Sequence, residues 1–101
     1  MERVIRDGKV AVIYSPGFGA GWYSWHRIEA LLFDSSVVSW IESKELDKIE
    51  SYLILKYPDV YIGKFTQLQI KWVPVGYRFR IDEYDGNETI VLKEEDEWII
   101  A

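Results

Sequence analysis

Residues 9–17 read KVAVIYSPG, and this stretch decides how the first half of the chain is interpreted. Lys9 to Tyr14 is short, apolar and rich in β-branched residues, which favours a strand, and the Ser-Pro-Gly that follows is typical of a turn. We therefore predict an N-terminal strand at residues 9–14 that runs directly into a glycine-rich loop.

The segment after this loop carries helical patterns. Residues 25–33 can form a short helix, and Asp34 or Ser35 can cap a second helical piece that contains the apolar residues of 37–41. Residues 44–57 place leucine and isoleucine at helical spacing and predict the best helix in the chain, which ends before a proline because the preceding residue is pushed out of the α region.

The second half of the chain changes to a period of two. Residues 67–73 and 77–84 alternate apolar and polar side chains, which predicts strands, and 89–92 and 98–100 add two more. The short Gly-containing turns between them favour antiparallel neighbours. The sequence therefore predicts one α+β domain over residues 1–101, with two to three helices on one face of an antiparallel meander of three to four strands.

Composition narrows the classes of function. The chain has 101 residues, no cysteine and a net charge of -5, so disulfides and thiolate metal sites are excluded and duplex nucleic acid is a poor partner. Its single histidine leaves no convincing metal site, and no cofactor is expected. No apolar stretch has the length of a signal peptide or a membrane span, so we expect a soluble, cytoplasmic protein without membrane contact.

The glycine-rich loop is the strongest functional candidate in the sequence. Gly17, Gly19 and Gly21 precede a predicted helix, and the amides of such a loop, with that of Ala20, can cradle an anion. The alternative is a tight strand-to-helix turn whose glycines only satisfy backbone geometry. The spacing matches neither the dinucleotide nor the nucleoside-triphosphate fingerprint.

Aromatic side chains surround this loop. Their flat faces beside free amides suit a base plus a phosphate, although large aromatics more often belong to the core. On one face of a predicted strand, Arg78 and Arg80 can supply positive charge, or they can form an ion-pair ladder with Asp82. The candidate ligand-binding residues are Ser15, Gly17, Phe18, Gly19, Ala20, Gly21, Trp22, Tyr23, Trp25, His26, Arg78 and Arg80.

The segments SPGFGAGWYSW and WVPVGYRFRIDEYDG resemble those of small proteins encoded by bacteriophages and their hosts. This resemblance implies an action on host components, either by sequestering a small nucleotide signal of host immunity or by binding a host protein. It supplies no residue roles.

Three functions are compatible with the residues. The first is a non-enzymatic module that binds a nucleotide-like or anionic small ligand at the loop. The second is a protein-interaction module that modulates a host protein through an aromatic or acidic surface. The third is a hydrolase using His26 with Asp82 or Glu83. The many Trp and Tyr residues also predict a homo-oligomer, with a dimer as the simplest assembly.

Overall fold

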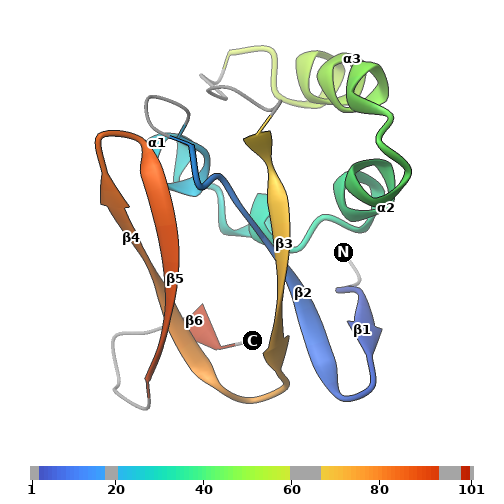
Figure 1. Cartoon of the computed structure of the whole chain (residues 1–101). Helices are drawn as coiled ribbons and strands as arrows, with labels where there is room; N and C mark the ends of the chain where they lie inside the picture. Colours follow the sequence, from blue (N-terminus) through green and yellow to red (C-terminus); the bar gives the residue numbers. More distant parts are fainter. Residues whose placement is uncertain (1–2, 18–20, 60–66, 94–98, 101) are drawn as a thin grey trace.

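A computed structural model of the chain describes residues 3–17, 21–59, 67–93 and 99–100 (Figure 1). The side chains of Trp25, Lys93, Ile99 and Ile100 also lie outside this description. In chain order the elements are β1 (Ile5–Arg6), β2 (Lys9–Tyr14), α1 (Tyr23–His26), the 3-10 helix η1 (Glu29–Leu32), α2 (Ser35–Ser43), α3 (Leu46–Lys56), β3 (Gln69–Pro74), β4 (Arg78–Tyr84), β5 (Asn87–Lys93) and β6 (Ile99–Ile100).

The described strands form two antiparallel sheets of three strands each. The first sheet has the order β1-β2-β3, and the second has the order β5-β4-β6. Helices α2 and α3 lie beside the first sheet in Figure 1, and the second sheet lies on its other side. The predicted α+β class is therefore confirmed.

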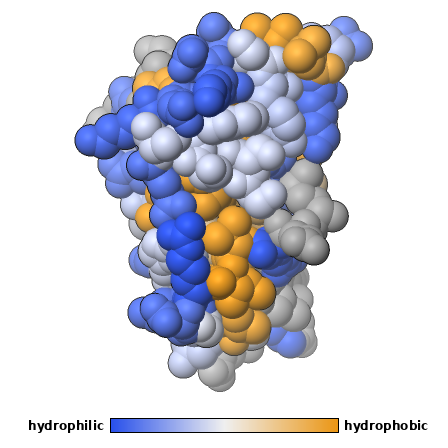
Figure 2. All heavy atoms as spheres, turned by 90° about the vertical axis from the view of Figure 1, so that its right-hand side faces the viewer, coloured by the Kyte–Doolittle hydropathy of each residue, from blue (hydrophilic) through white to orange (hydrophobic). Residues whose placement is uncertain are grey.

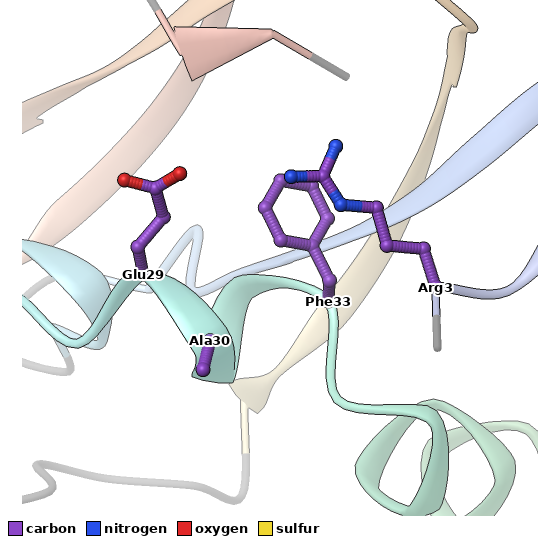
Figure 3. Close-up of a pocket in the computed structure, with 4 residues that line it drawn as sticks. All are labelled: Arg3, Glu29, Ala30 and Phe33. Atoms are coloured by element: carbon purple, nitrogen blue, oxygen red, sulfur yellow. The ribbon is translucent and has the colours of Figure 1, made fainter. Parts of the chain in front are cut away.

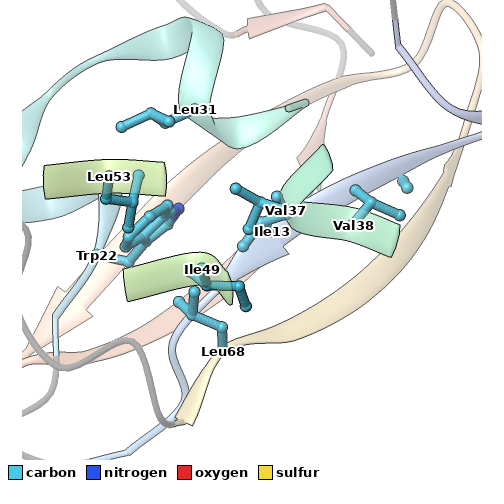
Figure 4. Packing of buried hydrophobic residues seen from close by; sticks show 9 residues of the cluster. Ile13, Trp22, Leu31, Val37, Val38, Ile49, Leu53 and Leu68 are labelled. Atoms are coloured by element: carbon cyan, nitrogen blue, oxygen red, sulfur yellow. The ribbon is translucent and has the colours of Figure 1, made fainter. Parts of the chain in front are cut away.

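Strand β2 is the centre of the molecule because both of its faces are buried. Ala11 and Ile13 point into one core cluster, which is completed by residues of α2 and α3 (Figure 4). Val10 and Val12 point the other way, into a cluster with Phe79 of the second sheet. A strand covered on both sides has no polar face, which explains the unbroken apolar run of residues 10–13.

The predicted meander was wrong at one connection. Strand β3 pairs with β2 along all six residues from Gln69↔Tyr14 to Pro74↔Lys9, whereas β4 pairs with β5 and β6. The turn after Pro74 therefore passes the chain from one sheet to the other. The buried backbone of β2 needs hydrogen-bond partners on both edges. Strand β3 pairs with one edge and β1 pairs with the other.

Asp34 fixes the start of α2 and joins it to α3. Its buried carboxylate accepts hydrogen bonds from the backbone N–H groups of Ser36 and Val37 through Oδ1, at 2.9 and 3.1 Å. Oδ2 accepts the hydroxyl proton of Tyr52 at 2.6 Å. One side chain therefore caps one helix and holds the next, and of the two predicted caps Asp34 is the one used.

Replacing Asp34 by alanine should lower the free energy of unfolding by about 2–4 kcal/mol, because the helix loses its cap and the Tyr52 hydroxyl loses its acceptor. Ser35→Ala is the matched control, since the Ser35 side chain does not cap the helix, and it should change stability by less than about 0.5 kcal/mol. Urea denaturation measures both, and equal losses would contradict the assignment.

Candidate functional site

The segments on either side of the glycine-rich loop are held by a buried carboxylate of the protein itself. Glu88, at the start of β5, is 1% exposed. Its Oε1 accepts the backbone N–H of Ser15 at 3.0 Å. Its Oε2 accepts the N–H groups of Trp22 and Ser24 at 2.9 and 2.7 Å and the Ser24 hydroxyl at 2.6 Å. Four donors thus converge on one negative charge, which is how a buried carboxylate becomes tolerable.

Backbone hydrogen bonds tie the same segment to the β4–β5 hairpin. The N–H of Glu88 donates to the carbonyl oxygen of Ser15 at 2.7 Å, and the N–H of Gly21 donates to the carbonyl oxygen of Gly86 at 2.8 Å. Gly21 has a φ of 69°, a left-handed conformation that favours glycine. Both ends of the loop are therefore anchored to one hairpin, and the amides of Ser15, Trp22 and Ser24 already hold an anion.

Glu88 was missed in the sequence analysis. A signal existed, because Glu88 shares a strand face with Ile90 and Leu92, and an acidic residue in an otherwise apolar alternation needs an internal partner. Gly17 has a steric role, while the anion-binding role of its amide stays a prediction. A Cβ there would lie 1.2 Å from Oε1 of Gln67, so the glycine leaves room for that side chain.

Trp22 does not form the predicted stacking surface, because its side chain is fully buried in the core cluster that contains Ala11 and Ile13. Its ring meets the ring of His26 edge to face at a centroid distance of 4.7 Å. Tyr23 is half-buried and also contacts His26. Phe18, Gly19, Ala20 and the Trp25 side chain lie outside the described residues, so their predicted contacts stay predictions.

His26 is held as a neutral imidazole. Its Nδ1 accepts the backbone N–H of Ile28 at 2.8 Å, and burial lowers its pKa to about 4. The Nε2 proton that this tautomer requires has no hydrogen-bond partner among the described residues. The two carboxylates predicted to assist a catalytic His26 bond elsewhere, Asp82 to Arg80 and Glu83 to the N–H of Gly86.

Arg78 and Arg80 lie away from the loop. The loop bonds to Gly86 beyond the last residue of β4, whereas Arg78 is its first residue, about 20 Å away at the rise of an extended strand. Arg80 is exposed and forms an ion pair with Asp82 at 2.7 Å, as in the ladder considered from the sequence. Among the described residues, the structure therefore does not bring Arg78 to Gly21.

A groove lies beside the loop, between β5 and the β2–β3 pair. It has a volume of about 360 Å³ and is lined by Tyr14, Pro16, Lys71, Asn87, Glu88, Thr89 and Ile90. Lys71 and Thr89 are exposed, and Tyr14 is partly buried. Because the Glu88 carboxylate is turned to the loop amides, Lys71 is the charged side chain that the lining offers to a ligand.

The edge of β5 that faces this groove has unpaired backbone groups. Tyr84 and Asn87 flank a two-residue turn and form a hydrogen-bonded pair. Because hydrogen-bonded pairs alternate along an antiparallel ladder, the backbone N–H and C=O groups of Thr89 and Val91 also point toward β4. The N–H and C=O groups of Glu88, Ile90 and Leu92 therefore point away from β4. Glu88 pairs with Ser15, and no described residue hydrogen-bonds to the outer backbone groups of Ile90 or Leu92.

The described residues lack two features that would indicate other functions. None of their helices is long and apolar enough to cross a membrane, and they contain no cluster of three His, Cys, Asp or Glu side chains suited to a metal ion. Figure 2 shows apolar surface near α3, where Ile54 and Leu55 are exposed. No family model matches the chain, and no match is found among curated proteins or solved structures.

Glu88→Ala should lower the free energy of unfolding by about 3–5 kcal/mol, because the buried amides of Ser15 and Trp22 and the partly buried amide of Ser24 lose their acceptor. Glu88→Gln should lower the free energy of unfolding by less than Glu88→Ala, because the amide oxygen can still accept a hydrogen bond. It should still be less stable than the parent, because the side-chain NH₂ group then faces a backbone N–H donor with which it cannot pair. The exposed Glu50→Gln is the control and should stay within about 0.5 kcal/mol of the parent. Thermal and urea unfolding measure the stability of these variants. A Glu88→Gln protein as stable as the parent would refute the claim that both carboxylate oxygens of Glu88 accept hydrogen bonds from the backbone.

The lowered pKa of His26 predicts a pH dependence of stability. Below pH 6.5 the unfolded chain binds a proton at this imidazole, whereas the folded protein does not until about pH 4, so stability falls as the pH drops through this window. His26→Asn keeps an acceptor for the Ile28 N–H without titrating. Urea titrations at pH 7 and 4.5 should show a smaller loss for the variant; equal losses would count against a neutral, buried His26.

Proposed function

We propose that the chain is a non-enzymatic binding module that holds an extended polypeptide segment in the groove between β5 and the β2–β3 pair. The observation that carries this proposal is the outer edge of β5, where no described residue hydrogen-bonds to the outward backbone groups of Ile90, which lines the groove, or of Leu92, two residues farther along the strand. Such an edge is a template for an added strand. Strand addition obtains affinity from main-chain hydrogen bonds and specificity from side-chain contacts.

The groove supports an acidic partner. Lys71 stands exposed on the wall opposite β5, and its ammonium would meet a carboxylate of the incoming segment. Tyr14 offers a ring, and Thr89 offers a hydroxyl, to side chains on either side of that carboxylate. The hydrogen bonds of Glu88 to Ser15 and Trp22 hold one end of the groove in place. The site is therefore already formed in the free protein, and little conformational entropy is lost on binding.

A second candidate is a small anionic or nucleotide-like ligand in the same groove. Its volume of about 360 Å³ lies at the lower end of small-molecule sites, and Tyr14 and Lys71 pair a ring with a cation. This keeps the ligand class predicted from the sequence but moves its site from the loop amides to the adjacent groove. A host protein fits the first candidate and a sequestered host signal fits the second, and both contexts stay predictions, as does the homo-oligomer.

Fluorescence polarisation with labelled ten-residue peptides of acidic, neutral and basic composition tests the first candidate. The acidic set should bind best, and Leu92→Pro should weaken binding about tenfold or more, because it removes an edge N–H without removing a β4 ladder bond. Lys71→Glu should abolish the preference for acidic peptides. Lys44→Glu, the same charge change on an exposed residue after α2, is the control and should leave it intact.

Two variants, Leu92→Pro and Lys71→Glu, distinguish peptide binding from the binding of a small ligand. Should the proline variant fail to fold by circular dichroism, Lys71→Glu alone decides, since an exposed charge change should keep the fold. Nucleotides, linear and cyclic, are tested in parallel by thermal shift. Stabilisation by a nucleotide that Lys71→Glu removes would favour the small-ligand candidate, and the absence of binding by any peptide would reject strand addition.

A further inference from the structure

The outer edge of β5 has the geometry for pairing with the same edge of a second copy. The backbone groups of Ile90 and Leu92 point away from β4, and no described residue hydrogen-bonds to them. Two antiparallel strands related by a two-fold axis form hydrogen bonds where their outward residues face each other. With the axis at Val91, Ile90 of each copy faces Leu92 of the other. This register satisfies the outward groups of both residues in both copies.

The side chains at the centre of this edge are uncharged. Ile90 and Leu92 lie on one face of β5 and Val91 lies on the other, where it is partly buried. The chain has a net charge of -5, so two copies repel each other unless they meet at a surface without carboxylates. Leu92 is exposed in the single chain, and Ile90 of a second copy directly opposite would cover it. Self-pairing therefore buries apolar surface and brings no like charges together at the axis.

The sequence after β5 supplies the acidic character that the groove favours. Residues 94–97 read EEDE. In the register centred on Val91, a second copy runs antiparallel to β5, so its chain beyond Leu92 continues toward the groove, whose wall carries Lys71. An acidic segment then approaches the lysine of the groove, and by symmetry the same contact forms twice.

We infer that the extended acidic segment bound by β5 is the β5 strand of a second copy, with the acidic run that follows it, in a two-fold dimer centred on Val91. This inference rests on the proposed strand addition and names its partner. It also replaces the aromatic surface, from which a homo-oligomer was predicted, by a strand edge as the interface.

Charges introduced at Val91 test the register by sedimentation velocity. Because Val91 lies opposite itself, Val91→Lys and Val91→Glu each place two like charges directly across the paired strands, which opposes pairing. The parent should sediment as a dimer at about 0.1 mM, and each variant alone should sediment as a monomer. An equimolar mixture of the two variants should recover the dimer, because a lysine then faces a glutamate.

Two controls accompany these variants. Val91→Thr is uncharged and should remain dimeric. Glu29→Gln makes the net charge less negative by one unit, as Val91→Lys does, and should also remain dimeric. Glu29 is exposed and lines a separate hollow with Arg3, Ala30 and Phe33 (Figure 3), and none of these residues lines the groove. Circular dichroism shows which variants are folded, and if neither charged variant folds, the assembly of the parent and the peptide below decide.

A peptide of residues 88–97, ETIVLKEEDE, distinguishes this inference from the proposed function. By fluorescence polarisation it should bind at least about tenfold more tightly than ETIVLKQQNQ, and Lys71→Glu should remove this difference. A monomeric parent at about 0.1 mM that still binds other acidic peptides would overturn self-pairing and leave strand addition intact. A dimer that persists in Val91→Lys alone would also overturn the inference. A monomeric parent that binds no peptide would reject both proposals.

Discussion

The buried Glu88 carboxylate is the interaction on which the rest of the structure depends. It lies on the second sheet and accepts hydrogen bonds from both sides of the glycine-rich loop, at Ser15 and at Trp22 and Ser24. The segments that flank the loop therefore cannot move away from Glu88 without leaving a buried charge unpaired, which costs several kcal/mol in proteins. This constraint fixes how β2 leaves the first sheet and where the β4–β5 hairpin sits beside it.

The same contact limits what the segments that flank the loop can do. The amides of Ser15, Trp22 and Ser24 already hold Glu88, and Trp22 is packed in the core, so these segments support the neighbouring β5 strand. Pairing of β5 with the first sheet stops at Glu88, and beyond it no described residue hydrogen-bonds to the outward backbone groups of Ile90, at the groove, or of Leu92. The structural role of the loop and the proposed binding role of β5 are thus two results of one contact.

The sequence predicted those elements whose signals are local. The period of residues 44–57 matches α3 at Leu46–Lys56, the alternation of 77–84 matches β4 at Arg78–Tyr84, and one of the two proposed caps of α2 is Asp34. Long-range choices were not predictable in this way. The exchange of partners between β3 and β4 and the reach of Glu88 across 73 residues to Ser15 depend on which faces of β2 must be covered. The two-residue β1 is too short to carry a pattern.

Amide hydrogen exchange followed by ¹⁵N–¹H spectra tests both halves of this account in one measurement. It predicts slow exchange for the N–H groups of Ser15, Trp22 and Ser24, which bond to Glu88, and for Val91, which faces β4. In the monomer, Leu92, one residue on, should exchange much faster because its N–H faces the open edge. Slow exchange at Leu92 in the monomer, or fast exchange at Trp22 and Ser24 in a folded protein, would contradict the central claim.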